Sequence, residues 1–179
     1  GPVPFFIADA AAKRTGKGKL IDLGGLIAHG QEPDSGGYHA DNEEEVEKVI
    51  TTKLSSGRPI VHFDNVDKPF GNSHLERLAT SRVFAWRVLG TNREGSARNL
   101  TVWCASGNNF TVCGDMGPRA LFFRLVSPLV DPSARTNFTI PNLRQWVLDH
   151  RVTLIRAALT ILRYGYQNPP STGRALGSF

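Results

Sequence analysis

The sequence predicts an α/β fold, a three-layer sandwich with a largely parallel central sheet and a C-terminal helical segment. Apolar runs typical of buried strands lie at residues 5–8, 59–63, 100–105 and 120–125. Segments between the first three runs carry apolar residues at helical spacing. Strands that alternate with helices in this way usually lie parallel. Two of the runs end in polar side chains, at the edge where open parallel sheets bind ligands.

A basic, glycine-containing turn separates the first strand from the first helix. It follows residues 5–8 and precedes a segment, residues 20–27, with helix-like apolar spacing. Its central residues are Thr15, Gly16, Lys17 and Gly18. A helix N-terminus offers free N–H groups, and the lysine adds a charge for the outer phosphates. The order of strand, turn, lysine and helix predicts an ATP-binding phosphate loop, with an ordinary basic turn as the alternative.

Two positions depart from the usual phosphate-loop pattern of Gly, four residues, Gly-Lys, and then Ser or Thr. Ala11 stands where the first glycine belongs, and Gly18 stands where the hydroxyl belongs. That hydroxyl normally contacts Mg²⁺. Gly18 has no side chain that could make this contact.

Residues 59–65, PIVHFDN, form the second strong signal. A continuous apolar run that ends in an acidic residue predicts a central parallel strand with Asp64 at its C-terminal edge. Nucleotide hydrolases use such an aspartate to hold Mg²⁺. The alternative is an aspartate that merely caps a turn, and the preceding phosphate loop favours the metal role. His62 is predicted to be a hydrogen-bonded core residue.

Polar residues 106–109, Ser-Gly-Asn-Asn, follow the apolar run at 100–105. If this strand lies in the same parallel sheet as residues 59–65, Asn108 comes close to Asp64. An amide there could orient a water molecule against the γ-phosphate. Taken alone, Gly-Asn-Asn is a turn signal.

The remaining elements are predicted from capping and spacing. Asp41 is expected to cap an acidic helix that ends at Gly57, after a short edge strand at residues 37–40. A further helix is expected from Asn72 to Ser81, and a long one from Pro141 to about Tyr166. Extended segments at 83–89 and 99–104 are joined by a turn at 90–96. The arginines flanking that turn are Arg87, Arg93 and Arg98.

Charge is divided unevenly along the chain. Residues 1–76 carry a net charge of −4, whereas residues 77–179 carry 13 arginines, no lysine and a net charge of +9. Guanidinium groups pair with phosphate or carboxylate in a planar fork, so the basic half suggests a phosphate-bearing partner. A solvated basic surface is the alternative. Cys104 and Cys113 lack metal-ligand companions and predict a cytoplasmic protein, and no stretch is typical of a membrane span or signal peptide.

Taken together, the segments ADAAAKRTGKG, IVHFDNVD, WCASGNN and GDMGPRALFFRL resemble the P-loop ATPase domain of bacterial, phage and plasmid primase–helicase proteins, relatives of the AAA+ and superfamily-three helicases. The resemblance covers about residues 4–166. It implies an ATP-driven motor in DNA replication with ATP and Mg²⁺ as cofactors. Single-stranded or forked DNA and a homo-oligomeric ring are the implied partners, and no membrane is implied.

The resemblance also implies individual roles. Thr15, Gly16, Lys17 and Gly18 would bind ATP, and Asp64 would hold the metal. Asn108 would be the sensor asparagine, Arg119 an arginine finger acting on a neighbouring subunit, and the hairpin around Arg93 a DNA contact. Many relatives carry a glutamate where Asn65 follows Asp64, and Asn65 cannot accept a proton. Asp67 is the candidate substitute for that base.

We divide the chain by this resemblance and by the composition of its two ends, since Gly1-Pro2 is typical of a cleavage remnant and the tail is rich in Pro, Gly and Ser. Residues 1–2 would be a cleavage remnant, 3–138 the P-loop ATPase core, 139–166 the C-terminal helical segment and 167–179 a linker.

Two other functions stay open. One is a nucleotide-binding switch or assembly module with weak or no hydrolysis, which Asn65 and Gly18 favour. The other is a DNA-binding scaffold built on a degenerate P-loop fold.

Overall fold

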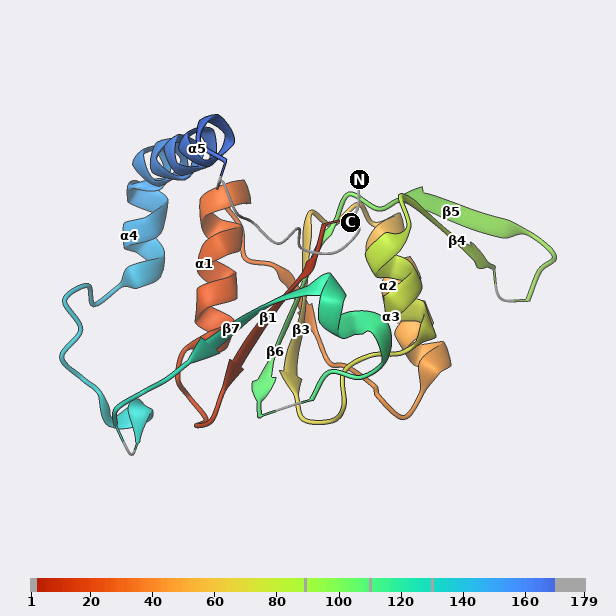
Figure 1. Cartoon of the computed structure of the whole chain (residues 1–179), viewed down its shortest axis with the longest axis horizontal. Coiled ribbons are helices and arrows are strands. Elements are labelled where there is room, and N and C mark those ends of the chain that lie inside the picture. Colours follow the sequence, from red (N-terminus) through yellow and green to blue (C-terminus); the bar gives the residue numbers. More distant parts are fainter. Residues whose placement is uncertain (1–2, 89, 110, 130, 170–179) are drawn as a thin grey trace.

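The fold is built around a parallel sheet, seen in a computed structural model that describes residues 3–88, 90–109, 111–129 and 131–169. The five strands run in the order β2-β3-β6-β1-β7, and every neighbouring pair is parallel (Figure 1). They span Phe5–Ala10 (β1), Asp34–Gly36 (β2), Ile60–Val66 (β3), Val102–Asn108 (β6) and Ala120–Leu125 (β7). The predicted α/β class with a mostly parallel sheet is confirmed.

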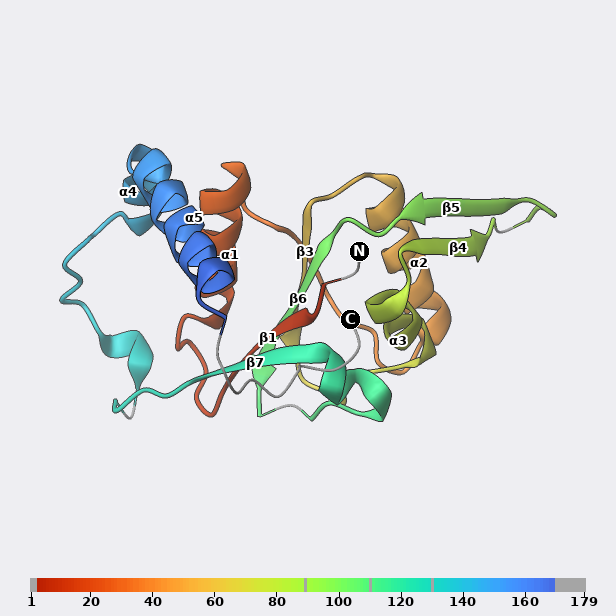
Figure 2. The ribbon, with the colours of Figure 1, turned by 45° about the horizontal axis from the view of Figure 1, so that its top comes forward.

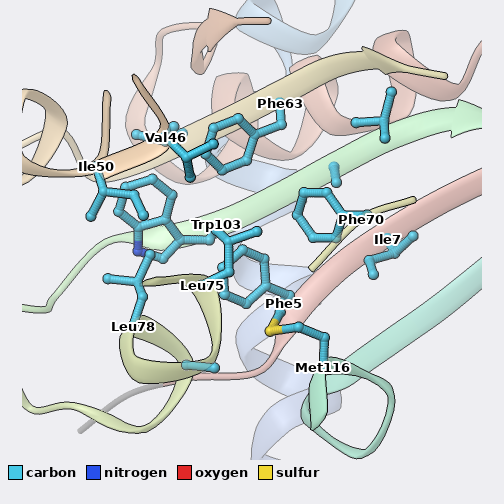
Figure 3. Close-up of a cluster of buried hydrophobic side chains, with 14 of the residues drawn as sticks. Phe5, Ile7, Val46, Ile50, Phe63, Phe70, Leu75, Leu78, Trp103 and Met116 are labelled. Atoms are coloured by element: carbon cyan, nitrogen blue, oxygen red, sulfur yellow. The ribbon is translucent and has the colours of Figure 1, made fainter. Parts of the chain in front are cut away.

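Helices cover both faces of the sheet, which makes three layers. Helix α1 (Lys17–His29) lies on one face, and α2 (Glu43–Ser55) and α3 (Ser73–Thr80) lie on the other (Figure 1). Because strand side chains alternate between faces, the large apolar residues of β1, β3 and β6 gather on the second face. They pack there with α2 and α3 into the main core (Figure 3), which includes Phe5, Ile7, Ile50, Phe63, Leu75 and Trp103.

The strand order brings the polar strand ends together. Strand β6 lies between β1 and β3, with Ala10 opposite Asn108 in the first pair. The register of β3 against β6 shifts between Phe63 and Val66. Asn65 sits within this irregularity in a left-handed conformation, with φ of 55°. Irregularities of this kind re-aim side chains at the end of a strand, and this one includes Asp64.

Two predictions between α1 and β3 are corrected. The edge strand is β2 at Asp34–Gly36, not residues 37–40, because it pairs with β3. Helix α2 is capped by Asn42, not Asp41, because the Asn42 side chain accepts the backbone N–H of Glu45 at 3.0 Å. An asparagine at this position is as good a cap as an aspartate.

An antiparallel hairpin projects from the sandwich beside α2 and α3 (Figure 2). It consists of β4 (Val83–Arg87) and β5 (Glu94–Arg98). The hairpin is as predicted, but its second arm is β5, not residues 99–104. The indole of Trp86 covers Gly95 so closely that a Cβ at Gly95 would lie 2.6 Å from the ring. A glycine there lets the two strands pair beneath the ring.

The predicted long C-terminal helix is two helices, α4 (Leu143–Asp149) and α5 (Arg151–Gln167). His150 separates them, with φ of −101° and ψ of 9°, outside the helical region. Helix α4 packs on α1 and buries Val147, whereas none of the described side chains of α5 is buried. The start of α5 also contacts α1, where Leu154 and Ile155 are half-buried, so the expected packing is confirmed for α4 and the start of α5.

Arg151 fixes this helical segment to α1. Its guanidinium donates hydrogen bonds of 2.9 to 3.2 Å to the carbonyl oxygens of Leu26, Ile27 and Ala28. The last carbonyls of a helix have no intrahelical partner, and they attract positive charge. One arginine thus satisfies the end of α1 and anchors the start of α5.

The expected cleavage remnant at residues 1–2 lies outside the described residues, as do residues 170–179 of the expected linker. Gln167, the first residue of that linker, is instead the last residue of α5. Among the described helices, none combines the length and apolar character needed to cross a bilayer.

Candidate functional site

A pocket of about 430 Å³ opens at the C-terminal edge of the sheet, where β1 leads into α1. It collects residues from three separate segments: the loop after β1, the end of β3 and the end of β6. The lining residues are Lys13, Arg14, Thr15, Gly16, Lys17, Gly18, Asp64, Asn65, Ser106 and Asn108. All four predicted ATP-binding residues lie here, together with three of the five predicted catalytic residues.

Residues 11–16 form the loop that connects β1 to the N-terminus of α1. Gly16 precedes the helix with φ of 94°, a conformation that glycine adopts without strain. The hydroxyl of Thr15 is buried and has no hydrogen-bond partner among the described residues. A buried polar atom without a partner is uncommon. An unpaired buried hydroxyl beside a helix N-terminus fits an anionic ligand.

Lys17 begins α1 and is buried, with 8% of its surface exposed. Its ammonium donates a hydrogen bond of 2.7 Å to the side-chain oxygen of Asn108 on β6. Burial lowers the pKa of Lys17 below its ordinary value, and the carboxylates of Asp9 and Asp64 oppose this effect. Lys17 therefore donates to Asn108 at the pocket, where the two carboxylates favour its charged form and burial opposes it.

Asp64 presents a carboxylate with 57% of its side chain exposed. Its Oδ1 accepts hydrogen bonds from the Ser106 hydroxyl at 2.7 Å and from the backbone N–H of Asn65 at 2.8 Å. Among the described residues, no group of three His, Cys, Asp or Glu side chains could hold a metal. One carboxylate is nevertheless enough for Mg²⁺ that also binds phosphate oxygens. The donor set at Asp64 fits that kind of site.

A chain of polar side chains lies behind Asp64, in which His62 and Ser106 are buried and Ser35 is exposed. His62 Nε2 is 2.9 Å from the Ser106 hydroxyl, and His62 Nδ1 is 3.5 Å from the Ser35 hydroxyl. Burial lowers the pKa of His62, against the influence of the Asp64 carboxylate. The prediction that His62 is a hydrogen-bonded core residue is confirmed. Ser106 was not among the predicted site residues, and its position directly after an apolar run was the available signal.

A second network ties the loop to β6 and β7. Asp9, at the end of β1, accepts the backbone N–H of Asn109 at 2.6 Å and the guanidinium of Arg124 at 3.0 Å. Arg124 also donates to the Asn109 side-chain oxygen at 2.8 Å, and the Asn109 amide donates to the carbonyl of Ala11 at 3.3 Å. Asp9 and Arg124 were missed in sequence because they are distant along the chain.

The other predicted site residues lie away from the pocket. Asp67 is exposed and does not line it. Arg119 ends the 3₁₀ helix η1 (Gly114–Arg119) before β7, and Ala120 pairs with Phe5 at the opposite edge of the sheet. Its guanidinium donates to the carbonyl of Glu76 at 3.3 Å and lies 3.8 Å from the Asp115 carboxylate. The roles assigned to Asp67 and Arg119 stay predictions.

The predicted DNA-binding arginines all belong to the projecting hairpin. Arg87 ends β4, and its guanidinium bonds the carbonyl of Thr91 and the side chain of Asn92. Arg93 is exposed in the turn, and Arg98 ends β5 opposite Val83. The hairpin and the pocket are therefore separate regions of the surface.

The fold and this site define an α/β protein whose polar pocket lies at the C-terminal edge of a parallel sheet. No family model and no curated protein matches the chain. An A-form apo structure of the NrS-1 C-terminal region is similar in fold, with a TM-score of 0.54 and 17% identity. A second A-form apo structure, of the NrS-1 C-terminal region (305–718), has a TM-score of 0.52 and 16% identity.

These similarities extend over most of the present chain. They cover 86% and 85% of it, respectively, but only 35% of each NrS-1 chain. The chain thus spans about a third of the length of the structures it resembles. At this level of identity the comparison establishes a shared fold.

Proposed function

We propose that the pocket at residues 13–18 binds ATP with Mg²⁺, and that the chain is the ATP-hydrolysing motor domain of a DNA replication helicase or primase–helicase. The observation that carries the proposal is the convergence of Lys17, Asp64 and Asn108 on one pocket beside the left-handed Gly16. These residues come from three segments far apart in sequence. A cation, a carboxylate and an amide at a helix N-terminus suit a nucleotide triphosphate and its metal.

Each residue has a chemical task in this proposal. Phosphate oxygens would take over the Lys17 ammonium from Asn108, which frees the Asn108 amide to hold the attacking water. Asp64 would hold Mg²⁺, and the metal would neutralise charge that develops on the phosphates. The loop N–H groups and the Thr15 hydroxyl would complete the binding of the phosphate oxygens.

A motor that hydrolyses ATP benefits from a group that accepts a proton from the attacking water, whereas a nucleotide-binding switch does not need one. Asp64 is the only carboxylate among the described lining residues of the pocket, and Asn65 cannot take a proton. This observation favours the second candidate, a nucleotide-binding switch or assembly module with weak or no hydrolysis. A positioned water can still attack without a strong base, because phosphoryl transfer depends mainly on positioning and charge stabilisation.

Titration of the chain with ATP by calorimetry, with Mg²⁺ and with EDTA, tests the proposal. We expect binding in both buffers and tighter binding with Mg²⁺, because Asp64 would hold the metal and the metal would offset the charge of the phosphates. Phosphate release measured on the same samples separates the two candidates. Release identifies a motor, and binding without release identifies a switch. Absence of binding in both buffers would refute the nucleotide site.

The hairpin supports the proposed DNA contact. Arg93 is exposed at its turn, whereas Arg87 is engaged within the turn. We expect Arg93→Ala to weaken binding of a single-stranded oligonucleotide modestly and to lower its salt slope by about one unit, as loss of one phosphate contact does. Arg156→Ala, at an exposed arginine on α5, is the matched control. Equal slopes for both variants and the parent would leave Arg93 as a solvated loop residue.

A further inference from the structure

We infer that Ser106 supplies the metal-side hydroxyl that the loop lacks at Gly18, an inference that rests on the proposed nucleotide site. In the usual loop pattern a Ser or Thr hydroxyl at the position of Gly18 joins the strand aspartate in holding Mg²⁺. The present chain would place that hydroxyl on β6, one strand away. Ser106 would then be a positioning and metal-binding residue of the proposed reaction.

The first support is the shared location of Gly18 and Ser106. A Cβ built on Gly18 would lie 3.7 Å from Asp64 Oδ1 and 3.7 Å from His62 Cε1. The Ser106 hydroxyl lies 2.7 Å from the same Asp64 oxygen. A side chain at position 18 would therefore approach Asp64 Oδ1 from α1, and Ser106 contacts the same oxygen from the sheet.

The second support is the direction of the hydrogen bonds. An ionised carboxylate can only accept, so the Ser106 hydroxyl donates its proton to Asp64. The Ser106 oxygen, 2.9 Å from His62 Nε2, is then the acceptor of a His62 N–H. His62 Nδ1 is left as the acceptor for the Ser35 hydroxyl. Every bond in this chain has one donor and one acceptor, and the orientation of Ser106 is set from both sides.

The third support is the bonding capacity that remains on Ser106. A hydroxyl oxygen has two lone pairs, and the bond from His62 uses one. The other is available to a cation held at Asp64, as it would be for a loop serine. Ser106 is nearly fully buried as a residue but lines the pocket together with Asp64. His62 and Ser35 would act through Ser106, without contacting the ligand.

The test compares ATP affinity with MgCl₂ and with EDTA for the parent, Ser106→Ala and the double variant Gly18→Ser/Ser106→Ala. The Mg²⁺ gain is the ratio of the ATP affinity with MgCl₂ to the ATP affinity with EDTA. We expect Ser106→Ala to bind ATP in EDTA within about twofold of the parent. Its Mg²⁺ gain should be about tenfold smaller, as changes around metal ligands cause. The double variant should recover that gain, because the new side chain at position 18 meets its neighbours at ordinary contact distances. A purely structural role would weaken binding equally in both buffers.

The single variant Gly18→Ser gives an independent measurement should Ser106→Ala fail to fold. If Ser106 already supplies the hydroxyl, a second one changes the Mg²⁺ gain by less than about twofold. An increase of about tenfold would mean that the hydroxyl was missing, and the inference would be wrong. An unchanged Mg²⁺ gain in folded Ser106→Ala, or no recovery in the folded double variant, would also overturn it while leaving the nucleotide site intact. A parent chain that binds no ATP in either buffer overturns the proposed function itself.

Discussion

Replacing Lys17 with alanine is expected to weaken ATP binding by about 10- to 100-fold. Hydrogen bonds to charged groups contribute about 1.5 to 3 kcal/mol, and each 1.4 kcal/mol corresponds to about tenfold in affinity. Lys17 is the buried cation of the pocket and is directed by Asn108 toward the site of the proposed phosphates. Its removal also takes away the positive charge that acts on the Asp64 carboxylate, so this carboxylate repels the phosphates more strongly.

The matched control is Lys19→Ala, two residues further along α1 at an exposed position. We expect this variant to bind ATP as the parent does, because an exposed lysine is largely screened. Calorimetric titration of the three proteins at one salt concentration measures the difference, and circular dichroism confirms that each is folded. Equal affinity of Lys17→Ala and the parent would show that the loop does not bind phosphate.

Replacing Arg119 with alanine is expected to lower ATP turnover by about 10³-fold or more in the assembled protein, the effect of losing an arginine finger. Arg119 lies before β7, at the sheet edge opposite its own pocket. With 27% of its side chain exposed, it can still contact a neighbouring molecule. Its own pocket is out of reach, so the proposed contact is to the nucleotide of another subunit.

Mixing Arg119→Ala with Lys17→Ala subunits tests action between subunits. Some mixed interfaces combine an intact lysine with an intact arginine, so the mixture should hydrolyse ATP when neither variant does alone. Sedimentation establishes that the variants assemble, because a monomer offers no interface. Arg156→Ala, at an exposed arginine on α5, should keep full turnover. An assembled but inactive mixture would instead leave Arg119 as a structural residue that bonds Glu76 and pairs with Asp115.

Much of the fold could be predicted from sequence because its signals are local. The apolar runs of β1, β3 and β6 are continuous, since strands covered on both faces bury side chains that point to either face. Lys17, Asp64 and Asn108 each follow such a run or the turn after it. Parallel strands end at a common edge, so their convergence could be expected from order alone. The helix expected from Asn72 to Ser81 is α3, and the Asn72 side chain caps it by accepting the Leu75 N–H at 2.9 Å.

Other features depended on contacts between distant residues. The edge strand β2 has little apolar character and is placed by its pairing with β3. The break at His150 interrupts a segment whose helical spacing continues across it, and Arg151 is held there by the carbonyls that end α1. Neither carries a local signal strong enough to compete with the periodicity around it.

By itself, the sequence determined which residues stand at the ends of the buried strands, because hydrophobic periodicity and turn chemistry act between near neighbours. The tertiary structure alone decided which individual side chains make contact there. Placing β6 between β1 and β3 brings Ser106 to Asp64, and pairing β1 with β7 brings Arg124 to Asp9. These contacts span 42 and 115 residues of chain. Their partners are chosen by strand order and register, which depend on the packing of the whole sheet.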